Sequence, residues 1–133
     1  MALPNGGGGY QVGAGNPSEA QLIVQAAPTD VTGDVTLTGA QLATGLFVVD
    51  TGADATATLP TVALTEAAIP NAEKANAAFD FSVCNKDAAY QVTIAVGTGW
   101  TLVGNMVVLE NTSATFRARK TGAGAWSLYR IAG

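Results

Sequence analysis

The chain has 133 residues, of which 48% are hydrophobic and 12% charged, and its formal net charge is −4. This length predicts one domain, and the hydrophobic content excludes a chain that is disordered by composition. Lys and Arg together number 6, too few for the extended basic surface with which a protein neutralises nucleic-acid phosphates. We therefore expect one folded domain that does not bind nucleic acid.

Residues 1–20 are rich in Gly, Asn and Pro and show no hydrophobic period. The first nine residues have neither the positive region nor the apolar core of a signal peptide. No apolar run reaches the roughly 18 residues that cross a bilayer. We expect a protein that is made in a cytoplasm, has no membrane partner, and begins with an extended arm. An ordered Gly-rich arm needs a surface, either a neighbour or its own domain, because each ordered residue costs about 1–2 kcal/mol of backbone entropy.

Residues 21–133 predict a single β-sandwich domain. Strand patterns begin at residues 22–24, and continue at 34–38, 46–49 and 55–59. The run at 46–49 is apolar throughout, which predicts a strand buried on both faces. Residues 62–68 lack Gly and Pro and predict a short helix, with Thr61 as N-cap and Pro70 as its stop.

Residues 78–131 predict five or six further short strands separated by Gly and Asn turns. Phe79, Phe81 and Val83 share one face of a strand, and Phe116 points inward on a later one. The complete pattern predicts a mainly all-β fold, an antiparallel sandwich or barrel-like domain with one short helix and the Gly-rich N-terminal arm. The chain shows no fixed internal repeat.

Three cations lie close together, and same-face alternation predicts that they line a solvent-exposed strand face and its exit: Arg117, Arg119 and Lys120. Trp100 and Trp126 are expected to fill the core, with a subunit interface as the alternative.

The composition favours a protein that is not an enzyme. His, the commonest general base and metal ligand, is absent, and a cysteine nucleophile needs such a basic partner. The one cysteine, Cys84, cannot form an internal disulfide, and we expect a buried thiol there. The Asp residues lie near turns and match no EF-hand spacing. We therefore expect no catalytic residue, no metal and no cofactor.

Residues 48–56 resemble the active-site loop of retroviral-type aspartic proteases. This resemblance implies a homodimer with Asp50 as the catalytic carboxylate, Thr51 as the brace of the loop, and residues 102–104 as the apolar-apolar-Gly segment behind it. In that family a helix follows the second glycine motif, whereas here residues 106–109 are β-like. Asp-Thr-Gly after an apolar strand is also ordinary turn chemistry. The protease is therefore a remote alternative.

A series of motifs extends over about residues 30–133. In order they are Leu59-Pro60-Thr61, the short helix, Ile69-Pro70-Asn71, Phe79-Asp80-Phe81, the Asn85 turn, Thr93-Ile94-Ala95, Gly97-Thr98-Gly99 and Trp126-Ser127-Leu128-Tyr129. Their order and spacing resemble the head decoration (cement or head-fibre) proteins of tailed bacteriophages. This resemblance implies a β-rich homotrimer on the outer capsid surface of the virion, assembled in the bacterial host cytoplasm. It would bind the major capsid protein at local three-fold positions and stabilise the expanded shell.

The arm is expected to make the capsid or inter-subunit contacts, because a Gly-rich backbone approaches a neighbour closely and pairs with an exposed strand edge. The predicted contact residues are Leu3, Pro4, Asn5, Gly6, Gly7, Gly8, Gly9 and Tyr10. Related patterns occur in phage fibre and tail-associated proteins, so a receptor-binding module of that kind is the alternative function.

Overall fold

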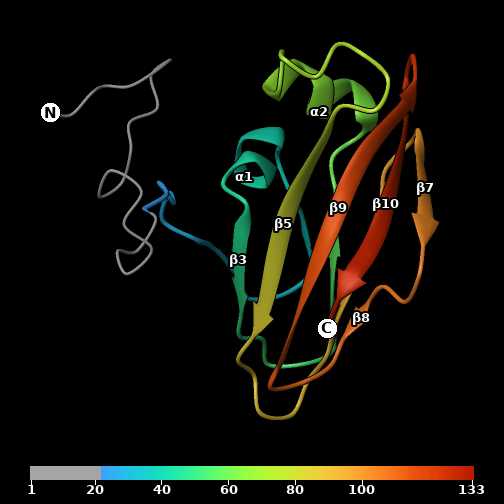
Figure 1. Ribbon diagram of the computed structural model, residues 1–133. Helices are drawn as coiled ribbons and strands as arrows, with labels where there is room; N and C mark the ends of the chain where they lie inside the picture. Colours follow the sequence, from blue (N-terminus) through green and yellow to red (C-terminus); the bar gives the residue numbers. More distant parts are fainter. Residues whose placement is uncertain (1–21) are drawn as a thin grey trace, which may run out of the picture.

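The computed structural model describes residues 22–133 as two β-sheets packed face to face, with two short helices at one end (Figure 1). The expected β-sandwich with a short helix is confirmed. The predicted arm, including its contact residues 3–10, lies outside the described residues.

The six-stranded sheet contains, in spatial order, β1 (Thr29–Val31), β3 (Leu46–Val49), β5 (Ala78–Asn85), β9 (Thr112–Gly122), β10 (Ala125–Ala132) and β7 (Trp100–Val103). The four-stranded sheet contains β2 (Val35–Thr36), β4 (Ala55–Thr58), β6 (Val92–Ala95) and β8 (Val107–Val108).

Both sheets are mixed rather than wholly antiparallel. From β1 to β8 each strand is followed by a strand of the other sheet, and, except for β5 and β7, strands two apart in sequence are neighbours. As a result β1, β3 and β5 pair in parallel, as do β2, β4 and β6. The intervening strand supplies much of the long crossover that parallel neighbours require. The later strands add antiparallel pairs, β5 with β9, β9 with β10 and β6 with β8, and a parallel pair of β7 with β10.

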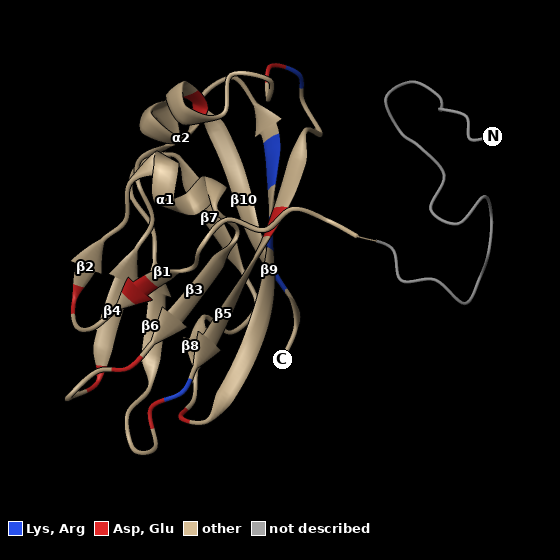
Figure 2. Cartoon of the chain, turned by 90° about the vertical axis from the view of Figure 1, so that its left-hand side faces the viewer, with Lys and Arg blue, Asp and Glu red and all other residues tan. Residues whose placement is uncertain are grey.

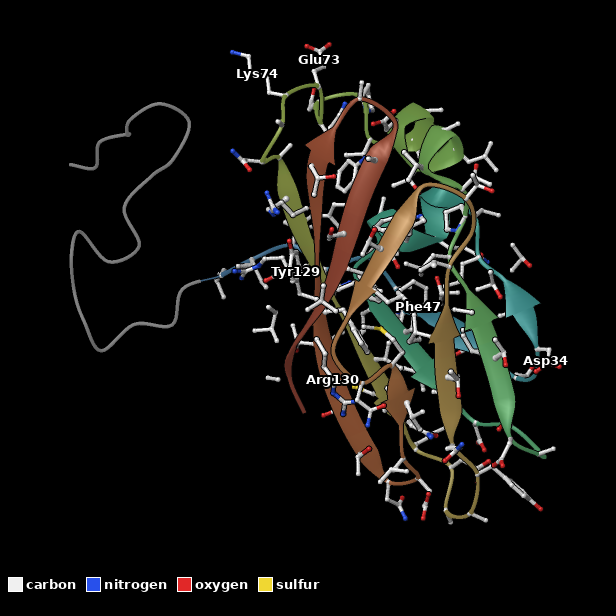
Figure 3. All side chains as sticks on the ribbon, turned by 90° about the vertical axis from the view of Figure 1, so that its right-hand side faces the viewer. Asp34, Phe47, Glu73, Lys74, Tyr129 and Arg130 are labelled. Carbon is white, nitrogen blue, oxygen red and sulfur yellow. The ribbon has the colours of Figure 1, made fainter. Side chains whose placement is uncertain are left out.

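The core lies between the sheets and follows strand alternation. Phe47, Phe81 and Phe116 are fully buried on three neighbouring strands of the larger sheet. The rings of Phe47 and Phe81 meet edge to face at 5.7 Å, and those of Phe81 and Phe116 stack at 5.4 Å. Phe47 is visible between the sheets in Figure 3. Phe116 thus points inward as predicted. Phe81 and Val83 share a buried face of β5, as predicted, and Phe79 packs against the edge of the core.

The helix predicted at residues 62–68 is confirmed as α2 (Val62–Ala68), with the Thr61 hydroxyl accepting the N–H of Leu64 at 3.3 Å. The strand expected at 34–38 is shortened to β2, and a second helix that was not expected, α1 (Gly39–Ala43), follows with Thr38 as its N-cap. Thr38 and Gln41 form a capping box there, each side chain accepting the other residue's backbone N–H. These reciprocal bonds satisfy donors that a strand would have left to a neighbour.

The two helices touch closely at Gly39. A Cβ added at Gly39 would lie 2.5 Å from the Cβ of Ala68 and 2.9 Å from the carbonyl oxygen of Leu64. Only a residue without a side chain allows this approach, so Gly39 sets the packing of α1 on α2.

Candidate interaction surfaces

The strand expected at residues 22–24 is not formed. The chain becomes a strand only at Thr29, and Leu22, Ile23 and Val24 are 77%, 85% and 100% exposed. The side chain of Gln25 tethers this segment to the domain, since its Nε2 donates to the carbonyl oxygen of Thr44 at 2.6 Å. An apolar triplet with strand propensity is therefore presented to solvent at the base of the arm.

The opposite edge of the larger sheet is also apolar. On β7, Leu102 and Val103 are 42% and 46% exposed, and Ile131 on the adjacent β10 is 51% exposed. Within residues 22–133, β7 pairs on one side only, with β10. Figure 3 faces this edge of the molecule.

The outer face of the larger sheet carries a paired polar row. Register places Asp80 beside Arg117 and Arg117 beside Tyr129. Arg117 donates to both carboxylate oxygens of Asp80, at 2.6 and 2.9 Å. These bonds hold the pKa of Asp80 below its usual value. Arg117 is exposed, as predicted for the outward cations.

Arg119 completes this row by binding a phenol. Its guanidinium donates to the Tyr129 hydroxyl at 3.0 and 2.8 Å and to Asn76 Oδ1 at 2.8 Å. The bonds from Arg119 lower the pKa of Tyr129, because donors favour the phenolate. The charged and hydrogen-bonding groups of this face largely bind one another, so they stabilise the sheet rather than offer free groups to a ligand.

Lys120, also expected on a solvent face, turns inward. Its side chain is 11% exposed, and its Nζ lies 3.0 Å from Glu66 Oε2 beneath α2. Trp126 Nε1 donates to the same Glu66 oxygen at 3.0 Å. The Trp126 bond first, and then Lys120, lower the pKa of Glu66. The prediction was wrong because Lys120 is in phase with the buried Phe116 and Ala118 on β9, which turns it toward α2, where Glu66 supplies the carboxylate partner.

The two tryptophans fill the core at this end. Trp126 is fully buried, as predicted, and its ring centroid lies 5.8 Å from that of Trp100. Trp100 is half-buried, and its Nε1 donates to the carbonyl oxygen of Pro60 at 2.9 Å.

A second polar cluster closes the opposite end of the sandwich. The Nδ2 of Asn85 donates to the carbonyl oxygens of Tyr90 and Val108, at 2.9 and 3.2 Å, and so joins β5 to β8. Asp87 accepts backbone N–H bonds from Ala89, Tyr90 and Thr51, at 2.8, 3.0 and 3.0 Å. These bonds, that of Ala89 foremost, lower the pKa of Asp87. The sequence indicated the Asn85 turn and placed Asp87 near a turn, but did not predict that Asp87 is buried and accepts three backbone bonds, for which the Asn-x-Asp spacing was the available signal.

The protease elements are not brought together. Asp50 is exposed at the end of β3, with its Oδ2 3.4 Å from Lys86 Nζ. Thr51 braces the turn, since its hydroxyl donates to the Ala53 carbonyl oxygen at 2.7 Å. Residues 102–104 begin on β7, separated from β3 by β5, β9 and β10. The loop that begins at Asp50 is therefore an ordinary turn, which was the alternative to the protease interpretation.

Cys84 was expected to be buried and is exposed. It alternates with Val83 on β5, so it faces outward, next to Val48 and Ser113 in register. Among residues 22–133, no group of three or more acidic or cysteine side chains is placed to hold a metal ion. In the same part of the chain, none of the helices has the length and apolarity needed to traverse a bilayer.

No protein-family model, curated protein or solved structure matches this chain. The function must therefore be argued from the surfaces described above.

Proposed function

We propose that this protein is a non-enzymatic structural component of a phage virion. It is a decoration or cement protein that binds the outer capsid surface as a homotrimer and stabilises the expanded shell. The observation that carries this proposal is the exposed apolar triplet Leu22, Ile23 and Val24 at the base of the arm. Contiguous apolar side chains on the surface of a small domain are typical of a protein–protein contact.

The polar groups of the domain support the same function. Its perturbed carboxyl groups, Glu66, Asp80 and Asp87, are each held by bonds that lock one part of the sandwich to another. Among the described residues, every buried side-chain nitrogen or oxygen has a hydrogen-bond partner. Such groups serve rigidity rather than chemistry, and a rigid body suits a protein that clamps its neighbours.

The partners we propose are the major capsid protein and other copies of this chain. Arm residues 3–10 make the capsid or inter-subunit contacts. A trimer bridging adjacent capsomers forms several contacts at once. After the first contact forms, the others benefit from a high effective concentration. Individually weak contacts then suffice to hold a shell against internal pressure.

The decisive experiment mixes the purified protein with phage heads that lack it, sediments the heads and measures the bound protein. We expect saturable binding whose copy number follows the three-fold positions, and a strong loss when residues 2–16 are deleted. Leu64→Ser, which removes an exposed apolar side chain from α2, is the matched control and should bind like the wild type.

Failure to co-sediment at any concentration would contradict the proposal and favour the fibre or receptor-binding module. An acid-range proteolytic activity that Asp50→Asn abolishes would contradict its non-enzymatic part.

A further inference from the structure

The residues after the arm have the composition of a strand that lacks a partner. Positions 22–27 read Leu-Ile-Val-Gln-Ala-Ala, with no charge, Gly or Pro, and Pro28 ends the run. The β-branched residues Ile23 and Val24 favour strands, and six residues match the usual strand length. Yet none of these residues is in a strand, and the first three side chains are largely exposed.

The larger sheet offers an edge that fits such a strand. Within residues 22–133, unpaired edges occur at β1 and β7 of this sheet and at β2 and β8 of the smaller one. The strand β7 is the longest of the four, with 4 residues against 3 in β1 and 2 each in β2 and β8. It carries no charge or proline, the features that protect natural edges from pairing.

The side chains around β7 match those of the segment. Leu102, Val103 and Ile131 are each about half exposed on adjoining strands. An added strand would bury them against its own Leu, Ile and Val side chains. Main-chain hydrogen bonds would then provide affinity, and these apolar contacts would fix the register.

Segment and edge cannot meet within one chain. They lie at opposite sides of the six-stranded sheet, because residues 22–28 lead directly into β1 (Figure 1). Five strand spacings separate β1 from β7, or about 24 Å, whereas six extended residues span about 20 Å and the segment points away from the domain (Figure 2).

Charge favours the same head-to-tail arrangement. All 6 Lys and Arg residues lie at position 74 or later, so the segment from β1 to β4 contains carboxylates and no cation of its own, and Lys86 from a later segment pairs with Asp50 at the end of β3. Figure 2 shows acidic residues around β1, β2 and the end of β4, and basic residues on β9. Asp30 lies on β1 and Arg130 on β10, the strand next to β7, so contact between the β1 side of one copy and the β7 side of the next brings unlike charges together.

We infer that residues 22–27 of one copy add as a strand to the free edge of β7 in a second copy. This inference deepens the proposed function and rests on its self-association. Because segment and edge are different surfaces, the interface is heterologous, and repeating it closes a ring when the rotation allows. A three-membered ring is the proposed trimer.

Sedimentation velocity of charge variants tests the contact from both sides. Ile23→Asp and Val103→Asp should each abolish the trimer at concentrations at which the wild-type protein is trimeric. Leu64→Asp, an equally drastic change of an exposed apolar residue on α2, should leave the trimer intact. Circular dichroism verifies that each variant is folded.

Intermolecular cross-linking tests the identity of the pair. In a Cys84→Ser background, which removes the exposed native thiol, a tagged Val24→Cys protein is mixed with an untagged Val103→Cys protein and a short bismaleimide. We expect a cross-linked tagged–untagged dimer, and at least a tenfold lower yield when Leu64→Cys replaces Val103→Cys.

Two outcomes would overturn the inference, and they bear differently on the proposed function. A trimer that survives Ile23→Asp and Val103→Asp, with equal cross-linking to position 64, would refute the strand donation and leave the decoration protein standing. A wild-type monomer that still saturates phage heads would refute the strand donation and the trimer, but not capsid binding.

Discussion

Two regions of this sandwich keep their shape by different means. The antiparallel ribbon of β5, β9 and β10 has strands of 8, 11 and 8 residues. In residues 29–68, which we call the coils, the chain winds back and forth between the two sheets. The strands of this region have only two to four residues. Long antiparallel ladders are stabilised by many backbone bonds and a shared core face. Short parallel strands make few such bonds, so single side chains and close contacts have to hold them.

Side-chain bonds of this kind recur through the coils. Asp34 Oδ1 accepts the N–H of Thr56 at 2.8 Å, which ties the β1–β2 turn to β4. Thr38 and Thr61 cap the two helices. The ribbon should therefore tolerate the loss of a polar contact but not of core volume, whereas the coils should respond to both.

The largest effect should follow removal of a ribbon core side chain. Phe116→Ala leaves a cavity beside Phe81, because Phe116 is fully buried and stacked on that ring. We expect the free energy of unfolding to fall by about 3–5 kcal/mol in urea denaturation. Ser113→Ala, at an exposed position of the same strand, should change it little. If Phe116→Ala lowered the free energy of unfolding no more than Ser113→Ala does, the core of the ribbon would not be a main source of the stability of the fold.

The next effect should come from the contact between the helices of the coils. In Gly39→Ala the added methyl group would collide with Ala68 and the Leu64 backbone. Overpacking of this kind costs about 1–3 kcal/mol. Gly33→Ala is the control, because nothing lies within 4 Å of its added Cβ. Equal unfolding free energies for the two variants would contradict the close helix packing.

Loss of a helix cap should have a smaller effect. Thr61→Ala removes the acceptor of the Leu64 N–H, and we expect a loss of about 1 kcal/mol in unfolding free energy. Thr98→Ala, the same change in an exposed turn, should be nearly neutral. A neutral Thr61→Ala would mean that α2 is held by packing alone.

The smallest effect should be seen in the pH dependence of stability. Because its backbone bonds lower the folded-state pKa of Asp87, this carboxylate stabilises the fold fully above its ordinary pKa of 3.8. Its contribution is lost as the pH falls through the lower folded-state pKa. Urea midpoints measured across this acid range should therefore decline more steeply in the wild type than in Asp87→Asn. The exposed Asp30→Asn should keep the wild-type slope, and a steep slope in Asp87→Asn would contradict the assignment.

Local signals predicted the parts of the fold that depend on near neighbours. Helix α2 and its Thr61 cap were correct, because propensity and capping act within one turn. The inward position of Phe116 and the shared face of Phe81 and Val83 were also correct, because a two-residue period is a property of the strand itself. The same period places Cys84 outward, as observed. The prediction of a buried thiol was wrong because it rested on the hydrophobic character of cysteine and not on this period.

Local sequence patterns therefore account for the β-rich class, the α2 helix and the alternating faces of the long strands. Contacts between distant segments set the other features: the parallel pairing of alternate strands, the Glu66 partner of Lys120, and the exposure of residues 22–24. Strand partners are chosen among segments far apart in the chain, and the burial of a charge depends on a partner from another element. A strand-forming segment becomes a strand only where an edge is within reach, and for residues 22–27 the proposed edge belongs to another copy.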